Sequence, residues 1–243
     1  MRALASDYDG TLYFDGVFKQ DDVKAIHQFQ KDGHLFGLCT GRPLVGVIDK
    51  HHINYDFYIL SSGAVIYDKD LTILYESVIP RKVVTSIVNQ YLNDYEIFIQ
   101  ANRDLYVLKE AENIIPLTFI SSLDDIAHDH FYSISINGKS EEHASKLCKI
   151  LNRKFPDIVA FQNIKYIDIV SKDCSKGDGI KRLRQLLQLD EISGIGDSYN
   201  DIPMLEEVDI SFTFHHSPDI VKQNASYLVS SIAESIEILS KKG

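Results

Sequence analysis

Short apolar runs alternate with helical segments at the start of the chain. The runs that indicate buried strands are residues 3–6 (ALAS), 34–40 (HLFGLCT) and 56–62 (DFYILSS). Residues 21–31 have apolar positions at mostly helical spacing and stop at Gly33, and Pro43 stands where it favours the first turn of a short helix. This order of strands and helices predicts a parallel sheet covered by helices.

The same pattern returns near the C-terminus. It predicts a helix at about 176–187, a strand at 192–196, a helix at 202–207, a strand at 209–214 and a last helix ending near Leu239. Together the two segments predict an α/β fold with a doubly wound, mostly parallel, Rossmann-like core sheet.

The middle of the chain has a different pattern. Its strands alternate apolar with polar residues, at 96–100 (EIFIQ), 105–109 (LYVLK), 132–137 (YSISIN) and 166–170 (YIDIV). Two amphipathic helices are expected at 83–92 and 141–155. We therefore expect an antiparallel sheet with helices on one face and a wet, polar second face. This predicts an α+β cap at 80–172, inserted between core segments 1–79 and 173–243.

Composition narrows the class of partner. The chain has 243 residues, of which 44% are hydrophobic, and a net charge of −10. Such a charge argues against nucleic acid or an anionic membrane as partner, because both need a surplus of Lys and Arg. No apolar run approaches the roughly 18 residues that cross a bilayer, and the opening residues turn polar too soon for a signal peptide, so we expect a cytoplasmic protein. Three widely spaced cysteines favour reduced thiols.

Polar residues gather where the predicted core strands end. In an open parallel sheet the ligand crevice lies outside the carboxyl ends of the strands. The residues expected there are Asp7, Asp9, Thr40, Gly41, Lys176 and Asp197.

Asp7 and Asp9 are two residues apart, so in a continuing strand both carboxylates point to one side and could share a cation. Gly10 then permits a sharp turn, and Thr11 adds a hydroxyl. An aspartate-rich turn without function is the alternative. A calcium loop of the EF-hand type fits poorly, because Gly falls at its position 4 and Phe18 at position 12.

A second acidic group consists of Asp197, Asn200 and Asp201 in GDSYND. Alone, these residues could be a helix cap. Beside Asp7 and Asp9, however, several carboxylates at one crevice would repel one another unless a divalent cation joined them. Oxygen-only ligands point to Mg²⁺.

A bound anion would complete the charge balance of the site, and the sequence offers donors that could bind it. Thr40 and the Gly41 amide, just before the helix expected at Pro43, form a corner of hydroxyl and N–H donors. Lys176 would bring a positive charge to the same place, and Arg42 is a further donor. A solvated surface charge is the alternative for Lys176.

The segments DYDGTL (7–12), CTGR (39–42), SKGDGI (175–180) and GDSYND (196–201) occur in this order. Jointly they resemble the four signature motifs of the haloacid dehalogenase-like (HAD) hydrolase superfamily, and the long insertion before the third resembles the Cof-type branch with a C2B cap. The chain departs from that branch at Ser62-Gly63-Ala64, where related proteins often have Asn-Gly-Ala.

The resemblance implies roles for these residues. Asp7 would attack phosphorus to form an aspartyl phosphate, and Asp9 would act as general acid and then general base. Mg²⁺ would be held by Asp7, the main-chain carbonyl of Asp9 and Asp197, with help from Asn200 and Asp201. Thr40, Gly41, Arg42 and Lys176 would bind the phosphoryl group.

The sequence thus predicts a Mg²⁺-dependent phosphatase for a phosphomonoester of a small metabolite, such as a sugar phosphate or a phosphorylated cofactor. A phosphomutase of the same fold and a catalytically silent ligand-binding regulator are the alternatives. Loss of Asp7 or Asp9 would mark the regulator, and both are present. The oligomeric state is left open by the sequence.

Overall fold

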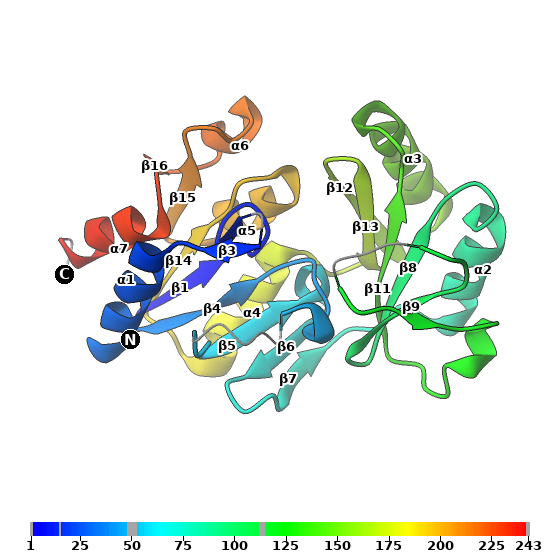
Figure 1. The fold of residues 1–243 in the computed structure, drawn as a ribbon, viewed down its shortest axis with the longest axis horizontal. Helices are drawn as coiled ribbons and strands as arrows, with labels where there is room; N and C mark the ends of the chain where they lie inside the picture. The colour runs from blue at the N-terminus through cyan, green and yellow to red at the C-terminus, as the bar shows by residue number, and fades with distance from the viewer. Residues whose placement is uncertain (1, 15, 48–52, 112–114, 242–243) are drawn as a thin grey trace.

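An eight-stranded sheet forms the centre of the first unit, the core unit (Figure 1). Its strand order is β16-β15-β14-β1-β4-β5-β6-β7. The first six run parallel to one another: β16 (Tyr227–Val229), β15 (Ile210–Phe214), β14 (Glu191–Ile195), β1 (Arg2–Ser6), β4 (Leu35–Cys39) and β5 (Phe57–Leu60). The last two, β6 (Val65–Asp68) and β7 (Ile73–Glu76), are antiparallel. The structure is a computed structural model, and it describes residues 2–14, 16–47, 53–111 and 115–241.

Helices cover both faces of this sheet. One face packs against α1 (Gln20–Lys31) and α7 (Ile232–Ser240), and the other against α4 (Lys176–Leu187), α5 (Ile202–Glu207) and the short α6 (Asp219–Gln223). Leu4 of β1 points to the first pair, whereas Ala3 and Ala5 point to the second group. Burial on both faces explains why the core strands are continuous apolar runs.

A six-stranded sheet forms the second unit, the cap unit, with order β10-β9-β8-β11-β13-β12. Its strands are β8 (Ile97–Ala101), β9 (Asp104–Val107), β10 (Thr118–Phe119), β11 (Phe131–Asn137), β12 (Ile158–Asn163) and β13 (Tyr166–Ser171). All pairs are antiparallel except β9 with β10. Helices α2 (Arg81–Tyr91) and α3 (Glu141–Lys154) pack on the face away from the core unit (Figure 1).

The second face of the cap sheet is not the wet surface that the alternating pattern predicted. Gln100 and Asp168 are each 5% exposed and Ser133 is 1% exposed, because this face lies against the core unit. The polar positions of the alternation therefore line the space between the two units. The sequence pattern identified the polar positions, and the structure places them at the cavity between the units instead of in open solvent.

Short elements complete the chain. The helix expected at Pro43 is a single 3-10 turn, η1 (Leu44–Gly46), within the described residues. The other 3-10 turns are η2 (Ser61–Gly63), η3 (Leu123–Asp125) and η4 (Tyr199–Asp201), and a small hairpin joins β2 (Tyr13–Phe14) to β3 (Val17–Phe18).

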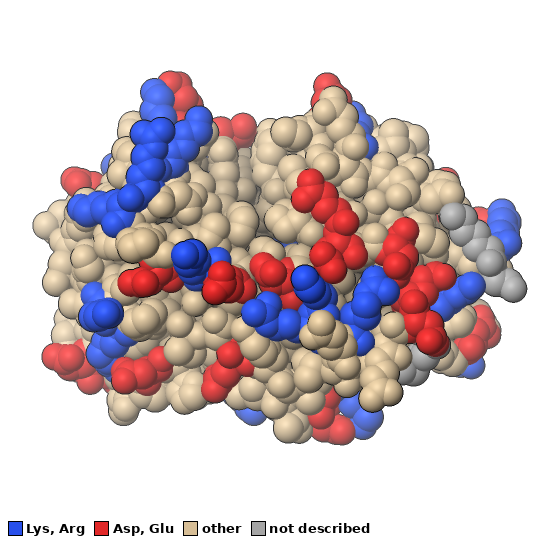
Figure 2. Space-filling model, turned by 180° about the vertical axis from the view of Figure 1, so that it is seen from behind, with Lys and Arg blue, Asp and Glu red and all other residues tan. Residues whose placement is uncertain are grey.

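The surface charge is mixed on the face seen from behind. Positive side chains gather over α3 at one corner of Figure 2, and elsewhere they alternate with Asp and Glu. Among the helices that the structure describes, none combines the length and the apolar character needed to cross a bilayer.

Candidate active site

The ends of three parallel strands bring the predicted site residues together. Asp7 is the first residue after β1 and Thr40 is the first residue after β4, whereas Asp197 is the second residue after β14. The pairing continues past the strands, since the Asp7 amide donates to the Ile195 carbonyl (2.9 Å) and the Thr40 amide donates to the Ile59 carbonyl (2.9 Å). The backbone of both residues is thus fixed by the sheet, as the topology of an open parallel sheet requires.

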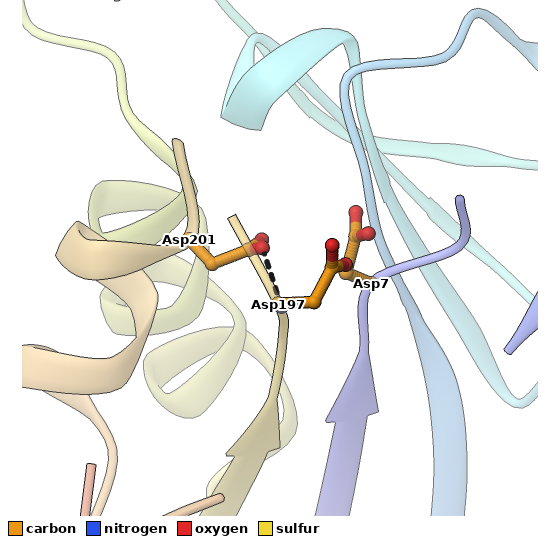
Figure 3. Close-up of side chains that lie close together, drawn as sticks. All are labelled: Asp7, Asp197 and Asp201. Carbon is orange, nitrogen blue, oxygen red and sulfur yellow. Dashed lines mark hydrogen bonds between the residues drawn. The ribbon is translucent and has the colours of Figure 1, made fainter. Parts of the chain in front are cut away.

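Three carboxylates converge at this edge (Figure 3). One oxygen each from Asp7, Asp197 and Asp201 lies within 4.8 Å of the others. Asp201 is oriented by the amides of Asp197 and Ser198, which donate to its Oδ2 at 3.0 and 2.9 Å. The cluster offers oxygen ligands only, at a spacing that one hard divalent cation can bridge, so its donor chemistry fits Mg²⁺.

Lys176 lies beneath the cluster. Its Nζ is 2.6 Å from Asp7 Oδ1 and 2.5 Å from Asp201 Oδ1, and the residue is only 2% exposed. Burial lowers the pKa of Lys176, but the charges of Asp201 and Asp7 outweigh it, so the pKa is raised and the ammonium stays charged. The structure therefore excludes a solvated surface role for this lysine.

One ammonium does not balance three carboxylates. Burial, together with the charges of Asp201 and Asp197, raises the pKa of Asp7 well above its usual range, although Lys176 opposes the shift. Burial and the charge of Asp201 raise the pKa of Asp197 to about 6. The site consequently favours protons or a cation beside these carboxylates.

Gly10 and Thr11 position Asp197 from the opposite side. The Thr11 hydroxyl donates to Asp197 Oδ1 (2.7 Å). Gly10 has φ +79°, and a Cβ there would lie 2.8 Å from Asp197 Oδ2. The turn in DYDGTL therefore needs glycine both for its backbone conformation and for the space that the carboxylate occupies.

The Asp9 carboxylate lies apart from the three-acid cluster. Arg42 donates to it through both Nε (2.7 Å) and a terminal nitrogen, while its other terminal nitrogen donates to the Gly46 carbonyl (2.8 Å). The Arg42 guanidinium also stacks over the Tyr8 ring, 4.6 Å from its centroid. Arg42 thus holds the side chain of Asp9, a contact that the sequence did not indicate.

The loop after β4 lies beside the carboxylate cluster and contains hydrogen-bond donors and small residues. The Arg42 amide donates to Thr40 Oγ1 (3.2 Å), and Thr40 is 1% exposed. Turn η2 supports the loop, since the Ser62 amide donates to the Thr40 carbonyl (3.0 Å). Ser62 has φ +55°, a left-handed conformation that Asn adopts more readily than Ser.

A cavity of about 560 Å³ opens between the two units above these residues. Its core side includes Asp7, Asp9, Thr40, Gly41, Arg42, Asp197, Ser198 and Asn200. Lys176 and Asp201 are buried, and the Lys176 ammonium links Asp201 to Asp7 of the cavity wall. Its cap side includes Phe98, Gln100, Ser135, Asn163, Tyr166 and Asp168, which the sequence reasoning did not single out. For Gln100, Ser135 and Asp168 the signal was present as the polar positions of alternating strands.

A family model described as haloacid dehalogenase-like hydrolase matches residues 4–235. The chain belongs to this family. The predicted relationship and the predicted hydrolytic enzyme are thereby confirmed, as is the predicted fold class. A Bacillus subtilis protein named "Putative phosphatase YxeH" is 26% identical over an alignment of 233 positions that covers 84% of this chain and 84% of that protein.

Solved structures of other proteins have the same fold as this HAD hydrolase. A haloacid dehalogenase-like hydrolase from B. subtilis has a TM-score of 0.86 at 20% identity, covering 100% of this chain and 99% of the other. The HAD subclass IIB sugar phosphatase BT4131 has a TM-score of 0.82 at 20% identity, with the same coverage. At these identities the likeness establishes the fold, and the substrate has to be argued from the site itself.

Proposed function

We propose that this HAD hydrolase is a Mg²⁺-dependent phosphatase that hydrolyses phosphomonoesters of small metabolites, with Asp7 as the nucleophile. The observation that carries the proposal is the convergence of the Asp7, Asp197 and Asp201 carboxylates beside the cavity between the two units, with buried Lys176 paired to Asp7 and Asp201. The phosphatase name of a relative that spans 84% of the chain supports the same reaction.

Mg²⁺ fits the acidic cluster, and we propose Asp7, Asp197 and Asp201 as its protein side-chain ligands, with the Asp9 carbonyl and Asn200 as further ones. Asn200 is 7% exposed and lines the cavity beside Ser198. When bound, the ion would neutralise the carboxylates and withdraw charge from the phosphoryl oxygens. The raised pKa values of Asp7 and Asp197 support this assignment, because both reflect negative charge that the protein alone leaves unbalanced.

In the first half of the reaction, an Asp7 oxygen attacks phosphorus in line with the ester oxygen. The new bond joins Asp7 to phosphorus while the ester P–O bond breaks, and Asp9 gives its proton to the departing alkoxide. Lys176 fixes the attacking carboxylate, and the Thr40 hydroxyl with the Gly41 amide binds phosphoryl oxygens as charge develops.

In the second half, Asp9 takes a proton from a water molecule whose oxygen attacks the same phosphorus. Asp7 leaves as a carboxylate and inorganic phosphate is released. The two hydrogen bonds from Arg42 to Asp9 support this base step, because they hold the carboxylate beside the cavity; in the first half the protonated Asp9 oxygen has to give up its hydrogen bond from Arg42. We propose Arg42 as a residue that positions Asp9, in addition to its expected contact with the phosphoryl group.

The test is phosphate release from p-nitrophenyl phosphate with Mg²⁺, with EDTA, and by Asp7→Asn with Mg²⁺. We expect release only by the wild type with metal. Asp21→Asn is the matched control, since Asp21 is an exposed acid of α1 whose carboxylate contacts Lys24 and no residue of the cluster. Hydrolysis by Asp7→Asn at the wild-type rate would refute the proposed nucleophile. Activity that requires a sugar bisphosphate activator would instead identify the phosphomutase.

A further inference from the structure

Three consecutive residues after β5 have left-handed backbone conformations. In turn η2, φ is +51° at Ser61, +55° at Ser62 and +95° at Gly63. Glycine adopts such angles freely, whereas serine adopts them with a loss of free energy. Both serines are buried, so two strained residues lie inside the protein. Among the residues that the structure describes, no other two neighbours both have a positive φ.

The serine side chains do not account for this conformation. Asn and Asp in left-handed turns are commonly stabilised by hydrogen bonds between their own side chain and the nearby backbone. The hydroxyl oxygens of Ser61 and Ser62 are buried, and neither has a hydrogen-bond partner among the described residues. The surrounding structure therefore has to impose the turn, which is typical of strained residues at functional sites.

One side of η2 holds the loop to which the proposed mechanism assigns phosphoryl binding. The Ser62 amide donates to the Thr40 carbonyl at 3.0 Å. The Ser61 amide donates to the Arg42 carbonyl, also at 3.0 Å. These two bonds fall on either side of Gly41, so they fix the loop at both ends. Since the φ and ψ angles of the turn set the direction of each amide, the bonds depend on its left-handed conformation.

The other side of η2 lies against the start of α4. A Cβ on Gly63 would overlap the Ser175 carbonyl oxygen and would lie 3.4 Å from the Lys176 amide nitrogen. A Cβ on Gly179, one turn further along α4, would lie 3.3 Å from the Gly63 Cα. Glycine at position 63 thus lets the backbone of the turn touch the backbone that carries Lys176.

We propose that η2 is a positioning element, in which Ser62 and Gly63 set the distance between the Thr40–Gly41 loop and Lys176. The turn acts through Thr40 and Lys176 and does not itself contact the substrate. This inference rests on the proposed phosphatase function, which gives those two residues their roles at the phosphoryl group and the nucleophile.

A double-mutant cycle tests the contact with α4, with p-nitrophenyl phosphate and Mg²⁺. The methyl group of Gly63→Ala should displace the start of α4 and lower kcat at least about 30-fold. In the Lys176→Met background the same change should lower kcat less than about 3-fold, because the group that it displaces is already absent. A loss that came only from unfolded protein would be equal in both backgrounds. Gly33 also has a positive φ but open space around it, so Gly33→Ala should leave kcat unchanged in both.

A second series tests the conformation of Ser62, and it decides the matter where Gly63→Ala fails to fold. Ser62→Gly and Ser62→Ala lack the hydroxyl but adopt φ +55° at least as readily as serine, so kcat should stay within about 3-fold of the wild type. Ser62→Val has a β-branched side chain that disfavours this φ, and its kcat should fall at least about 10-fold. Circular dichroism measures the folded fraction of each variant, so that kcat refers to folded protein.

The outcomes separate this inference from the function on which it rests. No hydrolysis by the wild type would defeat the phosphatase function and the inference with it. Hydrolysis by the wild type, together with an unchanged kcat in Gly63→Ala or with equal losses in the two backgrounds, would overturn only the positioning role. A kcat of Ser62→Ala as low as that of Ser62→Val would also overturn it, because the hydroxyl rather than the backbone would then matter.

Discussion

Lys176 Nζ lies 2.6 Å from Asp7 Oδ1, and the two side chains are 1% and 8% exposed. They are 169 residues apart in the chain, on opposite sides of the inserted cap unit. This contact joins the two core segments at the point of the proposed chemistry. The insertion can therefore vary in sequence without disturbing the pair, provided that its ends return to the same place.

Replacing Lys176 by Met should affect both activity and stability. The variant loses the cation that fixes Asp7 and binds phosphoryl oxygens, so we expect kcat to fall at least about 100-fold. It also leaves buried Asp7 and Asp201 without their partner, which should lower the free energy of unfolding by about 3 kcal/mol without metal. Urea denaturation with and without Mg²⁺ measures the second effect. An unchanged unfolding midpoint without metal would contradict the buried ion pairs.

The stability of the metal-free protein should depend on the pKa of Asp197. This pKa is raised from 3.8 to about 6 by folding, so the folded state binds the proton more tightly than the unfolded state. The corresponding stability is present below about pH 4 and is lost as the pH rises through about 6. In EDTA, the wild-type melting temperature should fall across this window relative to that of Asp197→Asn. Parallel curves of melting temperature against pH for the two proteins would refute the raised pKa of Asp197.

Adding Mg²⁺ should reverse this loss of melting temperature, and the increase in melting temperature should be larger at pH 7.5 than at pH 5.

Gly10→Ala should weaken metal binding without removing any ligand. The new methyl group would lie 2.8 Å from Asp197 Oδ2, and φ +79° is unfavourable for alanine. We expect the Mg²⁺ concentration for half-maximal activity to rise at least about 10-fold, which corresponds to 1.4 kcal/mol. The measurement is a Mg²⁺ titration of phosphate release. Gly33→Ala is the control, because Gly33 also has a positive φ (+85°) but has open space around its Cα.

Gly41→Ala should reveal the contact between the phosphate loop and Asp168. Its methyl group would lie 3.1 Å from Asp168 Oδ2 and 3.3 Å from Ser62 Oγ, so these two side chains have to shift by a few tenths of an ångström. We expect kcat/KM to fall about 10-fold, and the loss to be smaller when Asp168 is also replaced by Ala. A double-mutant cycle measures this coupling. Strictly additive losses would show that the two residues do not meet during turnover.

Much of the core unit was predictable because its signals are local. The strand over residues 3–6, the helix over 202–207 and the ends of the parallel strands follow from apolar runs and from the geometry of open sheets. Clustering of Asp7, Asp197 and Asp201 could be expected for the same reason, whereas the bond between Asp9 and Arg42 depends on side-chain packing that no spacing records.

The cap side of the cavity could not be predicted in the same way. Period-two alternation shows that Gln100, Ser135 and Asp168 share a face, but it does not tell whether that face meets water or another unit. That information comes from the packing of the inserted sheet against the core unit. The boundaries of the cap at 80 and 172 stay predictions, to be tested by whether the excised segment folds on its own.

The most direct test of the account is chemical identification of the phosphorylated residue. Wild-type enzyme turning over p-nitrophenyl phosphate with Mg²⁺ is quenched in acid, digested and mapped by mass spectrometry. We predict one phosphoryl group on Asp7, lost when substrate is exhausted before the quench and never found in Asp7→Asn. Steady turnover with no phosphorylated Asp7 at any quench time, or a phosphoryl group on another residue, would contradict the central claim.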